Sequence, residues 1–133
     1  MTSPLPTGAG AASRRWASPV LYLVGVVLLA TSAMMCLPLA ADLYYSNADW
    51  KAFAMSAVAS ALLGGFLVLV NRGGLQAGLT VRQAFLLTPA SWLGVAAVSA
   101  APFWLSDFGS VSRSLPDAIF EAVSGFTTTG ATI

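Results

Sequence analysis

The chain has 133 residues, of which 57% are hydrophobic and only 8% are charged. Soluble domains carry close to a quarter charged residues, so this composition indicates a protein of the lipid bilayer. A net charge of +1, no histidine and a single cysteine, Cys36, give no reason to expect nucleic-acid binding. They also exclude an internal disulfide and histidine-dependent catalysis, and they argue against a Cys/His metal site.

The first element is a tail followed by an apolar segment. Residues 1–15 are rich in Pro, Gly, Ser and Ala, which predicts a disordered cytoplasmic tail. The next stretch, residues 16–41, has no charge and is long enough to span a bilayer. Arg14 and Arg15 before an apolar run are also compatible with a secretion signal, but this run is too long for one, so we favour a retained helix. We expect Cys36 to be a small apolar packing residue.

A second uncharged stretch, residues 52–71, completes a predicted two-helix transmembrane hairpin over residues 16–71. Within it, Ser56, Ser60 and Gly64 recur at four-residue spacing. Such a stripe of small residues lets another helix approach closely, and we interpret it as a packing surface rather than a substrate path.

Residues 72–82 form a glycine-rich connector before a third uncharged stretch, residues 83–106. The connector matches neither the P-loop nor the dinucleotide-binding pattern, so we interpret it as a cytoplasmic linker. Prolines inside the three apolar stretches do not argue against spanning helices, because neighbouring helices can satisfy the freed backbone groups. The sequence therefore predicts three spanning helices.

The basic residues predict the orientation of these helices. Arginines precede the first span (Arg14, Arg15) and lie between the second and third (Arg72, Arg82), whereas the loop between the first two spans has one lysine and two aspartates. By the positive-inside rule, the N-terminus and the linker lie in the cytoplasm of a multi-pass membrane protein.

A shorter helix is predicted over residues 114–126, after an outer loop at residues 107–113. Ser114 can cap its start, Pro116 suits the first turn, and Asp117 suits the positive end of the helix dipole. Its apolar face carries Ile119, Phe120, Val123 and Phe126, and its polar face carries Asp117, Glu121 and Ser124. Ten or so residues reach about 15 Å, half of a bilayer core, so the helix enters from outside and stops near mid-depth.

Residues 127–133, the sequence TTTGATI, follow this half-helix. Non-helical backbone at membrane depth survives only inside protein or beside a water-filled cavity, and successive carbonyls there can replace the hydration shell of an ion. Gly130 permits the backbone angles of a tight loop, and the carboxyl end of the helix favours cations. The alternative is a frayed, threonine-rich segment at the outer surface.

The stretch SLPDAIFEAVSGFTTTGATI, preceded by a spanning helix, resembles the first helix–pore-helix–filter unit of the Trk/Ktr/HKT superfamily of potassium transporters. The two additional helices before it are similar to those of the TrkH branch. The resemblance implies four such repeats in one polypeptide around a single pore, each with one filter loop and a key glycine. It implies filter carbonyls at Thr127, Thr128 and Thr129, the filter glycine at Gly130, and potassium at Thr128 and Thr129.

The implied fold is an all-α integral membrane protein, in which a two-helix hairpin precedes one spanning-helix, pore-helix and filter unit over residues 83–133. The family has a second spanning helix after each filter, so we expect an N-terminal fragment that does not carry potassium alone. The resemblance implies a bacterial inner-membrane location among lipid, the remaining pore repeats, a homodimer and a cytoplasmic nucleotide-binding regulatory subunit. It implies no bound cofactor, with potassium as the transported ion.

Two acidic residues allow more than one role. Glu121 either concentrates cations at the outer mouth or braces the pore helix through hydrogen bonds, and we favour bracing. Asp117 suits a helix end better than an ion ligand. The alternative function is a small inner-membrane assembly or regulatory protein without ion conduction. An enzyme is disfavoured, because Asp117 and Glu121 form the single acidic pair and no nucleophile–base pair lies nearby.

Overall fold

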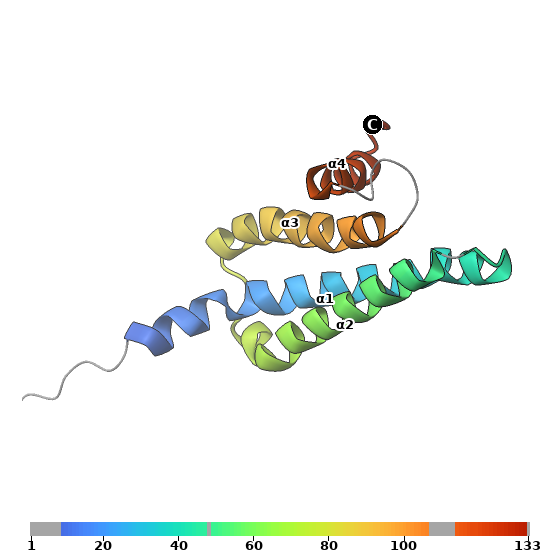
Figure 1. The fold of residues 1–133 in the computed structure, drawn as a ribbon. Helices are drawn as coiled ribbons and strands as arrows, with labels where there is room; N and C mark the ends of the chain where they lie inside the picture. Colours follow the sequence, from blue (N-terminus) through green and yellow to red (C-terminus); the bar gives the residue numbers. More distant parts are fainter. Residues whose placement is uncertain (1–8, 48, 107–113, 133) are drawn as a thin grey trace, which may run out of the picture.

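The computed structural model describes residues 9–47, 49–106 and 114–132, which are helical or in turns and loops (Figure 1). In chain order the elements are α1 (Ala9–Tyr44), α2 (Trp50–Val70), the short 3₁₀ helix η1 (Gly74–Ala77), α3 (Val81–Leu105) and α4 (Leu115–Phe126). Helices α1 and α2 lie side by side, α3 lies along them, and α4 lies on the far side of α3 (Figure 1).

Three helices are long and apolar enough to span a membrane, which confirms the predicted number of spans. They are Trp16–Tyr44 within α1, Trp50–Val70 and Val81–Leu105. The chain is therefore an all-helical, multi-pass membrane protein in its described part.

Two expectations about α1 are wrong. Residues 9–15, assigned to a disordered tail, are already helical. The stretch AGAASRR contains three alanines, the best helix formers, and it leads directly into the apolar span. Residues 1–8 of the expected tail lie outside the described residues. Cys36, expected to pack inside, is exposed on α1, and its thiol donates a hydrogen bond to the Ser32 carbonyl at 3.7 Å. Apolar side chains on a spanning helix can face lipid, so burial within the protein is not required of them.

The contact between α1 and α2 is built on small residues, as the serine and glycine stripe predicts. Ser56, Ser60 and Gly64 are all buried on α2. A Cβ atom placed on Gly64 would lie 2.8 Å from the carbonyl oxygen of Gly25, and one on Gly25 would lie 2.8 Å from that of Gly64. Only glycine at both positions allows the two backbones to approach so closely.

Buried hydroxyl groups join the same two helices. The Ser60 hydroxyl donates to the Leu28 carbonyl at 3.0 Å, and the Ser32 hydroxyl donates to the Ala57 carbonyl at 2.7 Å. Each bond ends on a backbone carbonyl of the partner helix, so hydrogen bonding adds to close packing in holding the hairpin together.

The first turn of α3 is tied to α1 near a bend of that helix. Pro19 lies inside α1, which bends near this point (Figure 1), and proline cannot donate the backbone hydrogen bond of a regular helix. The Gln83 amide donates to the Trp16 carbonyl at 2.6 Å. Gln83 also completes a capping box with Thr80 at the start of α3. One side chain therefore sets the start of α3 and anchors it to the bend of α1.

Candidate functional site

Helix α4 runs antiparallel to α3 and ends near its middle. Ala118 and Ala122 of α4 are buried with Ala100 of α3. At the carboxyl end of α4, the ring of Phe126 meets the ring of Trp92 in α3 edge to face, with centroids 4.9 Å apart. A helix of 12 residues therefore returns along about half of the 25-residue α3 and stops there.

The start of α4 agrees with the sequence prediction except at its cap. Ser114 occupies the N-cap position, but its side chain makes no capping hydrogen bond. Pro116 lies in the first turn, and Asp117 is the acidic residue of that turn. The helix dipole can therefore be stabilised by Asp117, while the expected serine cap is absent in this structure.

The face of α4 that packs on α3 is the small-residue face. Ala118, Ala122 and Ser124 are the buried residues of the helix. The bulky apolar side chains predicted to share one face are all exposed, at 37% to 44% of their surface: Ile119, Phe120, Val123 and Phe126. The amphipathic pattern thus predicts an apolar face, but the residues buried against the described chain lie on the small-residue face, and of the apolar face Phe126 meets Trp92 of α3.

The carboxyl end of α4 is closed by the threonines that follow it. The Thr129 amide donates to the Ser124 carbonyl at 3.0 Å, and the Thr128 amide donates to the Gly125 carbonyl at 3.2 Å. These two bonds form a Schellman motif, in which a residue beyond the helix adopts the left-handed conformation. Here that residue is Thr128, with φ of 57°. Glycine is usual at such a position, because a β-branched side chain is strained there.

Threonine hydroxyl groups reinforce this turn. The Thr127 hydroxyl donates to the Val123 carbonyl at 2.7 Å. It also lies 2.8 Å from the Thr129 hydroxyl, which acts as donor to it when the Thr127 proton is used on Val123. The last carbonyls of α4 are therefore occupied by protein donors from the loop.

Two further bonds fold residues 130–132 back against α4. The Ser124 hydroxyl donates to the Ala131 carbonyl at 2.5 Å, and the Thr132 hydroxyl donates to a carboxylate oxygen of Glu121 at 2.6 Å. Gly130 lies between these ties and the Schellman turn, with φ of 69°. A glycine at position 130 permits such an angle, whereas nothing in the sequence predicts the positive φ of Thr128 or either tie. Hydroxyl residues at positions 124 and 132 are the only sequence signal for them.

The carbonyl groups of this loop are not used within it. In the described part of the chain, no hydrogen bond ends on the carbonyl oxygen of Thr127, Thr128, Thr129 or Gly130. The amides of Thr127, Thr128 and Thr129 donate to carbonyls of α4, and the Thr127 hydroxyl does so as well. The described residues also contain no cluster of three His, Cys, Asp or Glu side chains that could hold a metal ion.

Comparison with known proteins gives a consistent group of relatives. The chain is 35% identical over 120 residues to the Trk system potassium uptake protein TrkI of Halomonas elongata, covering 90% of this chain and 23% of the relative. It is 33% identical over 110 residues to TrkH of Escherichia coli, covering 83% of this chain and 22% of the relative. The chain belongs to the Trk family. The resemblance expected from the sequence is thus confirmed.

The Trk relatives are much longer than this chain. The chain spans less than a quarter of their length. The Trk proteins that it matches are named as potassium uptake proteins. No family model matches the chain, and no solved structure gives a significant match.

Proposed function

We propose that the chain takes part in potassium transport across the membrane, as the first pore unit of a Trk-type uptake protein. The observation that carries this proposal is the group of four uncommitted carbonyls at Thr127 to Gly130, at the end of a helix that returns to the middle of α3. Its Trk relatives are potassium uptake proteins, which supports the same function.

The chemistry of the loop suits a selectivity filter. Carbonyl oxygens can replace the water around a dehydrated cation, provided that nothing else occupies them. The Schellman bonds and the ties to Ser124 and Glu121 hold the loop through its amides and side chains. The carbonyls of Thr128 and Thr129 are the proposed potassium ligands, with those of Thr127 and Gly130 on either side.

Backbone strain in the loop supports this assignment. Thr128 and Gly130 both have positive φ, two residues apart. Glycine adopts this conformation freely, whereas the β-branched Thr128 is strained in it. A strained residue persists where its surroundings fix it, and such residues cluster at ligand sites. The ties on both sides of Thr128 provide such surroundings. Glu121 then serves as a brace for the loop, and Asp117 as a helix-end residue, rather than as ion ligands.

A single loop cannot enclose an ion, so the proposed function needs further loops. The length of the Trk relatives leaves room for them, and we place this chain at the start of a longer polypeptide with additional filter loops. The proposed setting is the bacterial inner membrane, with a homodimer and a cytoplasmic nucleotide-binding regulatory subunit as partners. The alternative, an assembly or regulatory protein without conduction, is not favoured by relatives that are named for potassium uptake.

The test is the replacement Gly130→Ser in the complete polypeptide. A Cβ at Gly130 meets no atom within 4 Å, so the substitution acts through its positive φ rather than through a clash. We expect a weaker preference for potassium over sodium in ion-uptake measurements. The control Thr129→Ser keeps the backbone chemistry and should change the preference less. Unchanged discrimination in Gly130→Ser would remove this loop from the filter.

The proposed orientation has a separate test. A cysteine replacing the exposed Ser46, between α1 and α2, should react with a membrane-impermeant maleimide from outside intact cells, in a background where Cys36 is serine. A cysteine replacing Gly73 should not react. Gly73 is preferable to Gly74, since a Cβ on Gly74 would lie 2.7 Å from the backbone of Ser18. Reaction at Gly73 without reaction at Ser46 would invert the topology.

A further inference from the structure

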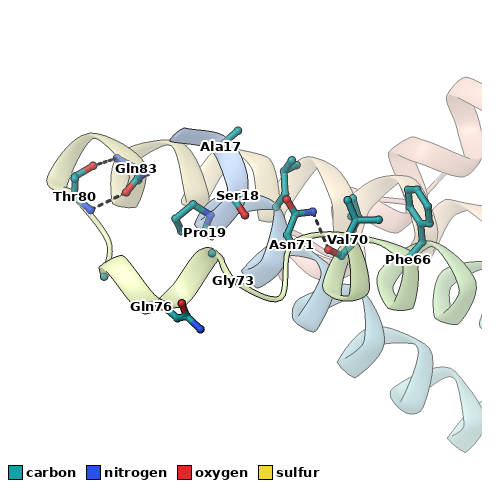
Figure 2. A pocket seen from close by; sticks show the side chains of 14 residues that line it. Ala17, Ser18, Pro19, Phe66, Val70, Asn71, Gly73, Gln76, Thr80 and Gln83 are labelled. Carbon is teal, nitrogen blue, oxygen red and sulfur yellow. Dashed lines mark hydrogen bonds between the residues drawn. The ribbon is translucent and has the colours of Figure 1, made fainter. Parts of the chain in front are cut away.

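A cavity of about 1000 Å³ lies at the arginine-rich end of the helical hairpin. It is formed by the bend of α1, the end of α2, η1 and the start of α3. Figure 2 draws Ser18 and Pro19 of α1 beside Asn71 and Gly73 of the connector, with Thr80 and Gln83 further along. Gly74, which also lines the cavity, sits directly against the backbone of Ser18, where a Cβ atom would lie 2.7 Å from it.

The lining of this cavity changes from apolar to polar. Leu21, Phe66 and Val70 lie on the side of the spanning helices, and Phe66 and Val70 are each 63% exposed. Ser18, Asn71 and Gln76 supply hydroxyl and amide groups on the side of the connector. An occupant that suits both ends has an apolar chain and a polar head.

The charged residues near the cavity indicate that the polar head is anionic. Of the six basic residues in the chain, four lie in sequence beside this end: Arg14, Arg15, Arg72 and Arg82. Of the five acidic residues, Asp42 lies in the last turn of α1 and Asp49 just before α2, at the opposite end of the hairpin, and the other three follow α3. Arg72 directly joins the lining residues Asn71 and Gly73, and Arg82 directly precedes Gln83. Both are exposed, and within the described residues neither forms an ion pair.

We propose that this cavity binds an anionic phospholipid. The phosphate would lie by Arg72 and Arg82, hydrogen-bonded by the amide and hydroxyl groups of the connector, and an acyl chain would run along Phe66 and Val70. Basic pockets between spanning helices are a recognised means of binding acidic headgroups. The inference concerns lipid binding and does not depend on whether the chain conducts potassium.

The first arm of the test removes charge. The chain is placed in nanodiscs of equal phosphatidylglycerol and phosphatidylcholine, released, and analysed by native mass spectrometry for retained lipid. We expect phosphatidylglycerol to be retained preferentially, and Arg72→Gln or Arg82→Gln to reduce this preference by about fivefold each. Lys51→Gln removes the same charge at the other end of the hairpin and should have no effect. Equal loss with Lys51→Gln would overturn the site.

The second arm fills the cavity without changing charge. Gly73 lines the cavity and Gly65 does not, and a Cβ on either meets no atom within 4 Å. Gly73→Leu should abolish preferential retention, and Gly65→Leu should preserve it. Retention in Gly73→Leu would show that the arginines attract lipid at the surface without this cavity. Displacement of the lipid by millimolar inorganic phosphate would show a phosphate site rather than a lipid site, and would likewise overturn the proposal.

Discussion

The α1–α2 hairpin buries the polar atoms of its contact and satisfies most of them, whereas the α3–α4 unit leaves bulky side chains and carbonyl groups uncovered. In the hairpin, Ser32 and Ser60 donate to carbonyls of the opposite helix, and Gly25 faces Gly64. In the α3–α4 unit, alanines make the contact, while Ile119 and Phe120 remain more than 40% exposed.

Under the proposed function, the hairpin is a scaffold, and the exposed face of the α3–α4 unit is the surface that further pore repeats would cover. Uncovered loop carbonyls at membrane depth cost several kcal/mol each in lipid unless protein or water surrounds them. The hairpin has no such need, because its backbone is helical and its contact is closed. The α3–α4 unit, by contrast, presents an apolar helix face beside the carbonyls of Thr127 to Gly130. We therefore expect substitutions in the hairpin to act on stability, and those in the loop to act on ion selectivity.

The largest effect is expected at the closest contact in the hairpin. Gly64→Leu places a Cβ atom 2.8 Å from the Gly25 carbonyl and 3.0 Å from the Leu29 amide nitrogen, so backbone must move. We expect a loss of about 3 kcal/mol or more in the free energy of unfolding. Gly65→Leu, one residue along, meets open space and should be nearly neutral.

The measurement is denaturant unfolding of both variants in detergent micelles, followed by circular dichroism. Equal stability of Gly64→Leu and the parent chain would show that α1 and α2 are not held by this contact. Equal destabilisation by Gly65→Leu would show an effect of leucine in α2 rather than of the contact.

The hairpin is the region that the sequence predicts best. Uncharged length identifies its two spans, and the four-residue spacing of Ser56, Ser60 and Gly64 identifies the face of α2 that packs. Both signals are local, since the first depends on the length of an uncharged stretch and the second on small residues at a helical period. The start of α1 is the exception. Its glycine, serine and proline residues predict a tail, whereas residues 9–15 are helical.

The α3–α4 unit is predicted only in outline. Its short helix and positive φ at Gly130 follow from length and residue type. The contact face of α4 has a signal of its own, the four-residue spacing of Ala118 and Ala122, but the bulky apolar residues carry a stronger pattern and point to another face. The left-handed Thr128 and the ties from Ser124 and Thr132 depend on how the chain folds back, which no periodicity encodes. The residue type at position 114 predicts a capping serine, but the type alone does not fix the side-chain geometry, and here Ser114 makes no capping bond.

An intermediate effect is expected where the loop is tied to α4. Thr132→Val keeps the shape of the side chain and removes the hydroxyl that donates to Glu121 at 2.6 Å. Loss of this bond should destabilise the folded-back loop by about 1 kcal/mol, because the bond is exposed and water can replace the donor. Thr132→Ser retains the hydroxyl and serves as the matched control.

Hydrogen–deuterium exchange of residues 127–132 measures this local change, and ion uptake by the complete polypeptide measures its consequence. Faster exchange in Thr132→Val alone, with reduced potassium preference, is the expected result. If Thr132→Ser behaves like Thr132→Val, the bond to Glu121 does not hold the loop. If exchange accelerates while selectivity is unchanged, the tie is structural and Glu121 plays no part in the filter.

The smallest effect on stability is expected for alanine substitutions at two serines of the small-residue stripe on α2. The Ser60 hydroxyl donates to the Leu28 carbonyl, whereas the buried Ser56 hydroxyl has no hydrogen-bond partner in the described structure. Ser60→Ala should cost about 0.6 kcal/mol, the usual worth of a hydrogen bond between membrane helices. Ser56→Ala should be neutral or slightly stabilising, because it removes an unsatisfied buried hydroxyl. Both substitutions keep a small side chain, so packing is preserved and unfolding in micelles reports the hydrogen bond alone. A greater loss from Ser56→Ala than from Ser60→Ala would mean that Ser56 finds a partner in the membrane, and that the hairpin is joined by three hydroxyl bonds rather than two.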